Sequence, residues 1–552
     1  MDDLLIRGAA VHDGSGGPAT RTAVAVRDGR VRALGEETGP ARRVVNADGL
    51  ALMPGIVDLH THFDAQATWD PTLSPSPSLG VTTVIAGNCG FGIAPCPAAQ
   101  RETVVRNLSV VEGMDLDALL AGTRWEFESF PDYLAQLRRT GPYANVGMLV
   151  GHSTVRTAVM GAEASTRAEP TAAELARMRA LVREALDHGA AGFASSFSPN
   201  HSGHGGVPMP STIASDAELH TLADTLREAG RGVFVMATGP RGTPEFMESV
   251  AARTGRPAFI VTVLTMHNAS SPTTAPDWYA RCAAARARGR EVWIQTSCQP
   301  LSFDFTLREP YLLLSHDAFD PIRTAAPEQL PALYADPDFR ARFRENLRTP
   351  RQGVLFQGEW DKVDLPDGST VADRARALGR DPLDLFLDTA LAEGLETRFI
   401  ARLFQNDDAA VAPLLRHEAG VVALSDAGAH MIYFCDAGFG LHLLSHWVRD
   451  TGTFTLPEAV RRLTRHPAEC YRIPDRGRIA PGAWADLLLF DPATVGLSAP
   501  HRVRDLPGGG ERVIRRPTGV HGVWVNGTEV FDGRDYAALP RGPGQVLDRF
   551  DA

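Results

Sequence analysis

Two histidines separated by one residue stand at the end of a short apolar run, in the segment MPGIVDLHTHFDAQ. If this run is a β-strand, His60 and His62 leave the same face, because side chains alternate along a strand. Two imidazoles that converge in this way can bind a divalent metal such as zinc. A chance polar pair without function is the alternative interpretation, and Asp58 and Asp64 on either side argue against it.

An aspartate follows a second apolar run, in GVVALSDAGAH. A carboxylate at the end of a late strand can bind a metal and accept the proton of an attacking water molecule. Asp426 could instead cap a helix, because a serine–aspartate pair before small residues is also typical of N-caps. Together with the histidine pair, the pattern favours a metal ligand and general base, and His430 nearby is a further candidate.

A cysteine stands in a glycine-rich turn after another apolar run, in TTVIAGNCGFGIAP. As a thiolate, Cys89 could bind or bridge metal, at a pH-dependent cost of deprotonation. A buried, unreactive cysteine is the alternative. The context of the other two motifs favours the ligand.

The long middle of the chain, residues 55–470, must bring these motifs together. Short apolar runs alternate with segments whose apolar residues lie three and four apart, such as TAAELARMRALVREALDHG. This alternation predicts a parallel sheet, and about eight repeats favour a closed (β/α)8 barrel. Active sites of such barrels lie at the carboxyl ends of the strands, where all three motifs stand.

Both ends of the chain carry short β-rich runs broken by DG, NG and GxG turns. Residues 1–54 and 471–552 are therefore predicted to form a small β-sandwich from the two termini. The segment 303–346, rich in proline, arginine and leucine, fits no barrel period, and we expect an insertion that could cover the active-site face. The predicted fold class is α/β, a TIM-type barrel with this added sandwich.

Composition narrows the class of protein. The chain has 552 residues, of which 44% are hydrophobic, and its formal net charge is −11. This balance is typical of a soluble globular protein and gives no electrostatic basis for binding nucleic acid. We see neither a signal-like start nor an apolar run long enough to span a membrane. Six cysteines without CxxC pairs suit reduced thiols. We therefore expect a cytoplasmic enzyme that acts on a small molecule.

In their order, the motifs HTHFDAQ, GNCG, GHSTVR and ALSDAGAH resemble the N-acyl-D-amino-acid deacylase (D-aminoacylase) branch of the amidohydrolase superfamily. The resemblance extends over nearly the whole chain, including RGRIAPGAWADLLLFD near its end. It implies hydrolysis of an amide-type C–N bond by metal-activated water. The metal site it implies contains His60, His62, Cys89 and Asp426, with Asp426 activating the water. The superfamily also implies a possible homodimer.

The chain departs from this branch at two metal ligands. The deacylases carry further histidines at the ends of the strands of the fourth and fifth units, the second followed by a lysine. Here these stretches read GVFVMATGP, without histidine, and AFIVTVLTMHNA, where His267 is displaced downstream. Lys362, the only lysine, lies well past the relevant strand, so a carboxylated lysine cannot bridge two metals. We therefore expect one metal per chain, most simply zinc, because three protein ligands and water suffice.

Alternatives remain for the ligands and for the function. Further ligands or substrate contacts could come from five histidines that could equally be solvent-exposed or supporting residues: His152, His201, His204, His267 and His430. The reaction could be hydrolysis of a cyclic amide or ester, or a hydrolytic deamination. A non-catalytic binding protein on a decayed barrel is the alternative outside enzymes, although three retained motifs argue against decay.

The lost lysine also bears on the substrate. Without it, the usual means of holding the carboxylate of a free amino acid is missing. Arg156 or Arg308 could replace it, but the sequence does not place either side chain at the site.

Overall fold

The computed structural model describes residues 1–35, 40–199, 201–261, 265–349, 354, 356–434 and 436–550. The chain divides into two compact units. The main unit comprises Met1–Thr265, Asp277–Cys298 and Ala412–Ala552, and the inserted unit comprises Met266–Pro276 and Gln299–Val411.

A parallel sheet of eight strands forms the centre of the main unit. Its strands lie side by side in the order in which they occur along the chain, and every neighbouring pair is parallel. All their residues are buried, as in parallel sheets that are covered on both faces. The strands are β8 (Ile56–Asp58), β9 (Val81–Ala86), β10 (Asn145–Gly151), β11 (Gly192–Ser196), β12 (Val233–Ala237), β13 (Ala258–Ile260), β14 (Val292–Thr296) and β18 (Gly420–Val422).

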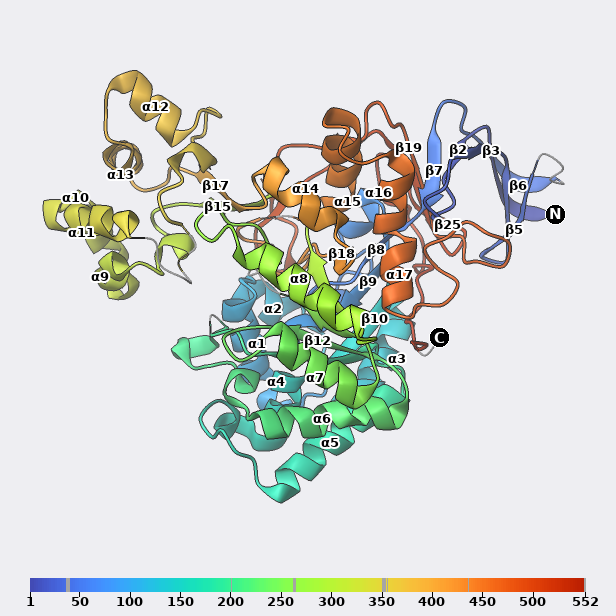
Figure 1. The fold of residues 1–552 in the computed structure, drawn as a ribbon, viewed down its shortest axis with the longest axis horizontal. Helices are drawn as coiled ribbons and strands as arrows, with labels where there is room; N and C mark the ends of the chain where they lie inside the picture. The colour runs from blue at the N-terminus through green and yellow to red at the C-terminus, as the bar shows by residue number, and fades with distance from the viewer. Residues whose placement is uncertain are drawn as a thin grey trace. The chain divides into compact units, whose positions relative to one another are not determined.

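Helices alternate with these strands along the chain (Figure 1). In α5 (Ala172–Asp187), Thr171 and Glu174 form a capping box that satisfies free N–H groups at the start of the helix. Met178 and Val182, one turn apart, lie on its buried face. Further helices that alternate with the strands are α3 (Phe130–Thr140), α6 (Asp216–Ala229), α7 (Pro244–Thr254), α8 (Thr274–Ala287) and α16 (Leu456–Leu463).

The two outer strands of the sheet, β8 and β18, are joined just beyond their carboxyl ends. Asp426 donates its backbone N–H to the carbonyl of His60 (3.0 Å), and His62 donates to the carbonyl of Ala427 (2.7 Å). These bonds bring together two segments that are more than 350 residues apart in the sequence. They place the HxH motif directly beside the SDAG motif.

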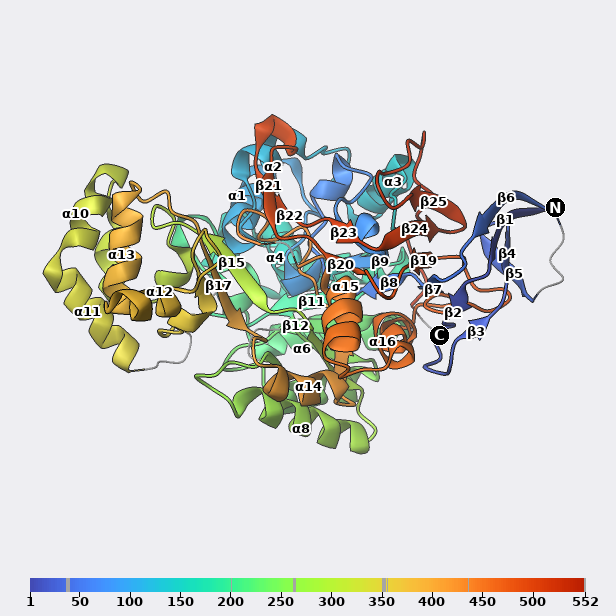
Figure 2. The ribbon, with the colours of Figure 1, turned by 90° about the horizontal axis from the view of Figure 1, so that it is seen from above.

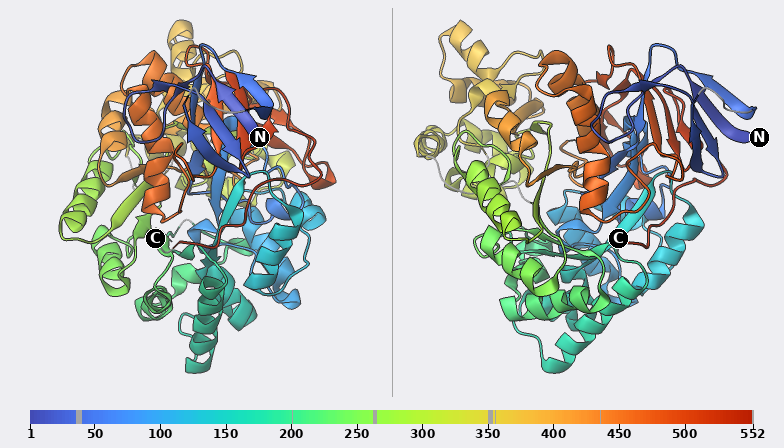
Figure 3. Two further views of the ribbon diagram at one scale, coloured as in Figure 1. Left: turned by 90° about the vertical axis from the view of Figure 1, so that its right-hand side faces the viewer. Right: turned by 45° about the vertical axis from the view of Figure 1, so that its right-hand side comes forward.

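Two smaller sheets of the main unit lie near the termini; one is formed by N-terminal strands alone, and the other combines strands from both ends of the chain (Figure 3). Side chains from both sheets, among them Ile6, Leu52 and Trp524, share one buried cluster. One sheet has the order β5 (Arg30–Leu34), β4 (Val24–Arg27), β1 (Asp2–Arg7) and β6 (Ala41–Asn46). The other has the order β25 (Thr528–Phe531), β24 (Val520–Val525), β19 (Leu487–Phe490), β7 (Ala51–Pro54), β2 (Ala10–Val11) and β3 (Thr20–Arg21).

The tight turns predicted from DG and NG pairs are confirmed. Asp28 and Gly29, between β4 and β5, have φ values of 51° and 75°. Asn526 and Gly527, between β24 and β25, have φ values of 46° and 76°. Two consecutive residues with positive φ match the twist of the flanking strands, which is why glycine follows asparagine or aspartate at such turns.

The inserted unit is built from a small antiparallel sheet and five short helices (Figure 2). Aromatic rings such as Phe319, Tyr334 and Phe343 pack against one another between the helices. The predicted insertion, 303–346, lies inside this unit. Its elements are β15 (Leu301–Phe305), β17 (Phe399–Phe404), β16 (Val363–Asp364), α9 (Asp320–Thr324), α10 (Leu330–Ala335), α11 (Pro337–Arg348), α12 (Val371–Leu378) and α13 (Pro382–Ala392).

The cysteines of the described residues are buried and free. Cys435 lies outside the described residues. Within the described part of the chain, no helix has both the length and the apolar character that crossing a membrane requires.

Candidate metal centre

His60 and His62 follow β8 directly and direct their rings to the same point. Their Nε2 atoms lie 3.3 Å apart. Only 3% of His60 and 1% of His62 is exposed. The structure therefore places both imidazoles on one face at the carboxyl end of the strand, as the HxH spacing predicted.

Asp426 reaches the same point from β18. Its backbone is left-handed, with a φ of 59°, and Oδ1 lies 3.4 Å from Nε2 of His60 and 3.1 Å from Nε2 of His62. Burial by itself would raise the pKa of this carboxyl group, but the contacts with the two histidines outweigh burial and hold the pKa of Asp426 well below its usual range. The next described helix, α15 (Phe439–His442), begins far downstream, so the helix-cap interpretation of Asp426 is wrong.

The glycine of the SDAG motif has a steric role. Gly428 has a φ of 93°, and a Cβ atom there would lie 2.7 Å from the carbonyl carbon of His62. The absence of a side chain therefore allows the segments after β8 and β18 to approach closely.

Cys89 approaches from the turn Asn88–Gly90 after β9. Its backbone φ is 56°, and its Sγ lies 3.7 Å from Nε2 of His60. Burial raises the pKa of its thiol well above the usual range, and the nearby carboxylates of Glu112 and Asp426 raise it further. A positive charge at this point would therefore be needed to hold Cys89 as a thiolate.

Four of the separations between these side chains match the spacing that one tetrahedral ion requires. Bonds of about 2.0–2.3 Å at tetrahedral angles place neighbouring donor atoms roughly 3.3–3.6 Å apart. The separations here are 3.3 Å between the imidazoles, 3.1 and 3.4 Å to Asp426, and 3.7 Å from His60 to Cys89. Nitrogen, oxygen and sulfur donors together are also the set that zinc accepts. The donors therefore fit one divalent ion.

Gln295 of β14 supports His60, although the sequence analysis did not single it out. Its Oε1 lies 3.0 Å from Nδ1 of His60, and its Nε2 donates to the carbonyl of Leu59 at 3.4 Å. Because the amide oxygen only accepts, His60 carries its proton on Nδ1 and leaves the lone pair of Nε2 directed at the other donors.

Glu112, directly after α1 (Arg101–Val111), is a second residue that the sequence analysis missed. Its Oε1 lies 3.4 Å from Nδ1 of His62, and only 4% of its side chain is exposed. Burial raises the pKa of Glu112 well above its usual range, and Asp426 and Asp64 raise it further. Its donor atom also lies close enough to His62 and Asp426 for the three to hold an ion. It follows a helix, so the strand-end signal that identified the other residues could not identify it.

Two aspartates beside the HxH motif lie behind the donor atoms. Asp58 accepts the hydroxyl of Ser425 and, at 3.2 Å, the backbone N–H of His60. Asp64 accepts the N–H of Gly87 at 3.1 Å. Burial raises the pKa of each to about 7. Both tie the strand ends to one another rather than supplying ligands.

Comparison with known protein families identifies the family to which this chain belongs. A model described as the amidohydrolase family matches residues 43–531. The chain belongs to this family. The resemblance stated from the motifs is thereby confirmed.

Curated relatives of this amidohydrolase extend over its whole length. N-acyl-D-aspartate deacylase of Alcaligenes xylosoxydans xylosoxydans is 31% identical, with 100% of this chain and 96% of the relative covered. N-acyl-D-glutamate deacylase of the same organism is 29% identical, with 99% and 96% covered. These relatives confirm the predicted class, a deacylase-like amidohydrolase.

Solved structures of deacylases are similar to this chain over its whole length. N-acyl-D-glutamate deacylase from Bordetella bronchiseptica, complexed with zinc and a phosphonate mimic of the tetrahedral intermediate, has a TM-score of 0.67 at 28% identity, with 99% of this chain and 100% of that chain covered. A D-aminoacylase studied for its binuclear metal centre has the same TM-score at 26% identity, with both chains covered fully.

The histidine of GHSTVR belongs to a buried ionic network of the amidohydrolase. His152 meets Ser195 Oγ through Nδ1 (2.9 Å) and Glu218 Oε1 through Nε2 (2.8 Å). The guanidinium of Arg156 pairs with the same glutamate and is fully buried. Both ring nitrogens of His152 are occupied, and Arg156 is held where it supports the fold, so neither fits the ligand or carboxylate-binding role considered for it.

His201 and His204 lie in the loop after β11, with different surroundings. Nδ1 of His201 lies 2.7 Å from the hydroxyl of Ser196, and its ring meets Phe91 edge-on at 4.9 Å. Burial and then neighbouring histidines lower the pKa of His201 to about 3. His204 is exposed, and its backbone N–H bonds to Asn107. His204 therefore has the environment of a solvent-exposed residue.

His430 is the candidate that the structure brings to the centre. Its Nε2 lies 3.7 Å from Oδ2 of Asp426 and 3.9 Å from Oε2 of Glu112. Its own N–H bonds to the carbonyl of Glu112 at 2.5 Å, which joins the SDAG segment to the end of α1.

The two stretches in which the deacylases carry further histidine ligands, and this chain does not, are described to different extents by the structure. The first stretch forms β12 and the residues after it, and it supplies no imidazole. In the second, residues 262–264 lie outside the described residues. His267 belongs to the inserted unit, where Gln405 Oε1 accepts its backbone N–H at 2.8 Å. Arg308 lies in the same unit and pairs with Glu396 at 2.5 Å.

Proposed function

We propose that this amidohydrolase hydrolyses the amide bond of N-acyl amino acids or related acyl amides. In this proposal, His60, His62, Asp426 and Cys89 hold one zinc ion. The observation that carries it is the set of donor atoms 3.1–3.7 Å apart at the carboxyl ends of β8, β9 and β18. The deacylase names of full-length relatives support the reaction, and the zinc in the Bordetella enzyme supports the metal.

A divalent metal, when bound, would activate water and polarise the amide carbonyl. The two oxygens of Asp426 are suited to different tasks. Oδ1 faces both histidines, whereas Oδ2 lies on the side of His430, 3.7 Å from its Nε2. We assign Oδ1 to the metal site and Oδ2 to the general base, which accepts a proton from water and returns it to the leaving nitrogen.

Gln295 and Glu112 would position the two histidine ligands. Gln295 Oε1 lies 3.0 Å from Nδ1 of His60 and so favours the tautomer whose Nε2 is free to bind metal. Glu112 lies 3.4 Å from Nδ1 of His62 without a hydrogen bond and packs against that ring. In this proposal both residues orient a histidine, and Glu112 could in addition supply an oxygen ligand, because its carboxylate lies within reach of His62 and Asp426.

The substrate would differ from that of the named deacylases in how it is held. The lysine that follows the second family histidine is absent here, and Arg156 is buried against Glu218. We therefore propose a less polar acyl amide, whose binding does not depend on a lysine–carboxylate pair.

The architecture that we propose for this function is a (β/α)8 barrel with a β-sandwich formed by both termini. Its boundaries are those predicted from the sequence: 1–54, 55–470 with an insertion near 303–346, and 471–552. The backbone bonds between the segments after β8 and β18 support closure of the barrel. A homodimer also stays a prediction, which sedimentation velocity would test.

Elemental analysis of the purified protein tests the function, beside turnover of a panel that comprises N-acyl-D- and N-acyl-L-amino acids, less polar acyl amides and dihydrouracil. One zinc per chain and release of a free amino acid or amine are expected, and zinc without turnover of any acyl amide would overturn the deacylase reaction. Turnover of dihydrouracil alone would point to cyclic amides instead. Absence of metal after reconstitution would contradict the mechanism and favour a binding protein.

A further inference from the structure

A cavity of about 590 Å³ lies in the main unit at the amino end of β18. Arg416 and Glu418, which line it, precede the strand, whereas Asp426 of the metal centre follows the strand. The opposite wall comes from α16 and α17 (Arg465–Cys470). The cavity is thus separate from the proposed active site, and its size is typical of sites for small molecules.

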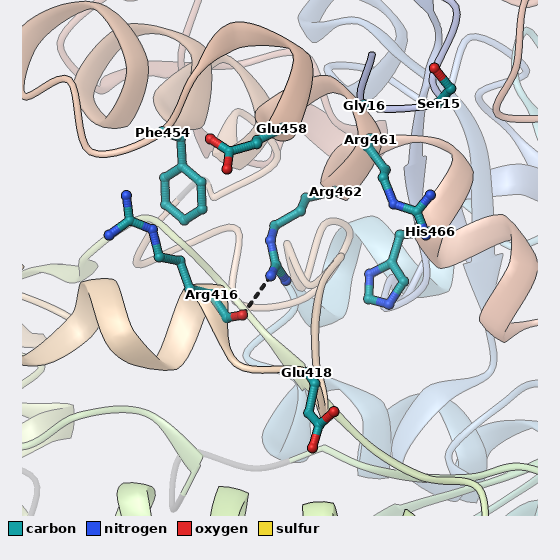
Figure 4. A pocket seen from close by; sticks show the side chains of 9 residues that line it. All are labelled: Ser15, Gly16, Arg416, Glu418, Phe454, Glu458, Arg461, Arg462 and His466. Carbon is teal, nitrogen blue, oxygen red and sulfur yellow. Dashed lines mark hydrogen bonds between the residues drawn. The ribbon is translucent and has the colours of Figure 1, made fainter.

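Three arginines, Arg416, Arg461 and Arg462, line this cavity, and the guanidinium of Arg416 extends toward Phe454, apart from the other two (Figure 4). Arg462 donates to the backbone carbonyl of Arg416 at 2.6 Å, and Arg416 donates to the carbonyl of Thr453. In the part of the chain that the structure describes, no ion pair joins Arg416 or Arg462 to a carboxylate.

The acidic residues at the cavity form no ion pair with Arg416 or Arg462 among the described residues, although Glu458 lies near enough to both for an electrostatic interaction. Glu458 is bound to the backbone N–H of Thr455 at 2.8 Å and to its hydroxyl at 2.7 Å, as part of a capping box. Glu418 directs its carboxylate away from the guanidinium of Arg462 (Figure 4). Arg461 shares Glu469 with Arg465, at 3.7 Å and 2.5 Å respectively. The wall therefore presents more cationic than anionic groups.

His466 adds a neutral donor or acceptor to the same wall. Its Nδ1 is buried and has no hydrogen-bond partner within the described residues. Burial, followed by Arg462 and Arg461, lowers the pKa of His466 to about 4, which is consistent with a cationic environment.

We propose that this cavity binds the phosphate group of a phosphate ester. Guanidinium groups bind phosphate oxygens through two parallel hydrogen bonds, and a dianion matches two or three of them better than a monocarboxylate does. The volume exceeds that of phosphate alone and leaves room for an organic group. The proposal does not depend on the proposed amide hydrolysis.

Isothermal titration with inorganic phosphate and with phenyl phosphate tests it. The titration is done on the wild-type protein and on His60→Ala/His62→Ala, so that phosphate at the metal centre is excluded. We expect one site per chain in both proteins. Acetate, a monoanion, should bind at least roughly tenfold more weakly than phosphate.

Variants locate the site. Arg416→Gln/Arg462→Gln should weaken phosphate binding by roughly tenfold or more, because each removes a charged hydrogen-bond donor. Arg461→Gln should also weaken it, and decides the matter if the double variant fails to fold. Arg472→Gln is the matched control: it follows α17, pairs with Glu291 at 2.7 Å, does not line the cavity and should bind phosphate as the wild type does.

Two results would overturn the proposal. One is the absence of saturable phosphate binding in a folded protein. The other is an affinity that stays unchanged in Arg461→Gln and in the double variant, which would mean an adventitious ion only. Zinc content is measured in parallel on each variant, to show whether a substitution at the cavity has also altered the metal centre.

Discussion

The two ends of β18 carry opposite kinds of site. After the strand, Asp426 joins two imidazoles and a thiol, a set of neutral and anionic donors that suits a cation. Before the strand, Arg416 faces a cavity with two further arginines, a set that suits an anion. The donors after the strands come from the ends of three strands of one sheet, whereas the three arginines come from two helices, α14 (Asp408–Arg416) and α16.

This difference determines what each end requires of the fold. At the metal centre, donor atoms must lie within tenths of an ångström, and three donors are held by strand ends and by backbone bonds between them. At the cavity, long arginine side chains can adjust to a ligand, so less of the backbone needs to be fixed. The variants that follow test this contrast, from the largest expected effect to the smallest.

Removal of both histidines should have the largest effect. His60→Ala/His62→Ala should lose its zinc and at least roughly 10³-fold in kcat/KM, because several kcal/mol of metal-based stabilisation are lost. Elemental analysis and turnover measure this. The contrast between the two ends would fail if phosphate binding at the cavity disappeared as well in a folded protein.

Asp426→Asn separates the two tasks of this residue. Asparagine keeps an oxygen for the metal but cannot accept a proton, so kcat should fall roughly 10²- to 10⁴-fold while most of the zinc stays bound. Rapid-quench or steady-state kinetics with parallel metal analysis would show this. Wild-type kcat in the variant would contradict the general-base role.

Glu112→Gln and Gln295→Leu should each weaken zinc binding by roughly 10- to 100-fold, since each loses the group that orients a histidine. Competition with a chelator of known affinity measures the change. Glu418→Gln, at the other end of β18, is the control and should leave the affinity for zinc unaltered. If all three variants bind zinc with the same affinity, neither Glu112 nor Gln295 orients a metal ligand.

Gly428→Ala should destabilise the fold by about 1–3 kcal/mol, because it adds a Cβ against the backbone of His62 at a positive φ. Gly452→Ala is the matched control, with a φ of 62° and open space around the position. Thermal unfolding compares the two. If Gly428→Ala lowers the free energy of unfolding no more than Gly452→Ala does, the close approach of the two segments does not require glycine at position 428.

The smallest effect concerns pH at the cavity. His466 has a folded-state pKa of about 4, below the ordinary value of 6.5, so the unfolded chain binds a proton that the folded chain does not. Stability should therefore fall as pH falls from 6.5 toward 4, and His466→Gln should reduce this slope. Urea unfolding at several pH values measures it. An unchanged slope would place His466 in a more solvated environment.

The sequence alone determined the family, the α/β class and which residues are candidate metal donors. His60, His62, Cys89 and Asp426 follow apolar runs, and the ends of parallel strands meet at one edge of a sheet, so their convergence could be predicted. The turns at Asp28 and Asn526 were equally local, because positive φ selects glycine-containing pairs.

Tertiary structure alone decided the supporting residues and the second cavity. Glu112 reaches His62 from the end of a helix, and Gln295 reaches His60 from within a strand, so neither has a local sequence signal. His152 and His430 looked alike in the sequence, but packing directed one into a buried ionic network and the other to Asp426. Sequence spacing reports which face of an element a side chain occupies, whereas the partner on that face depends on packing between distant segments.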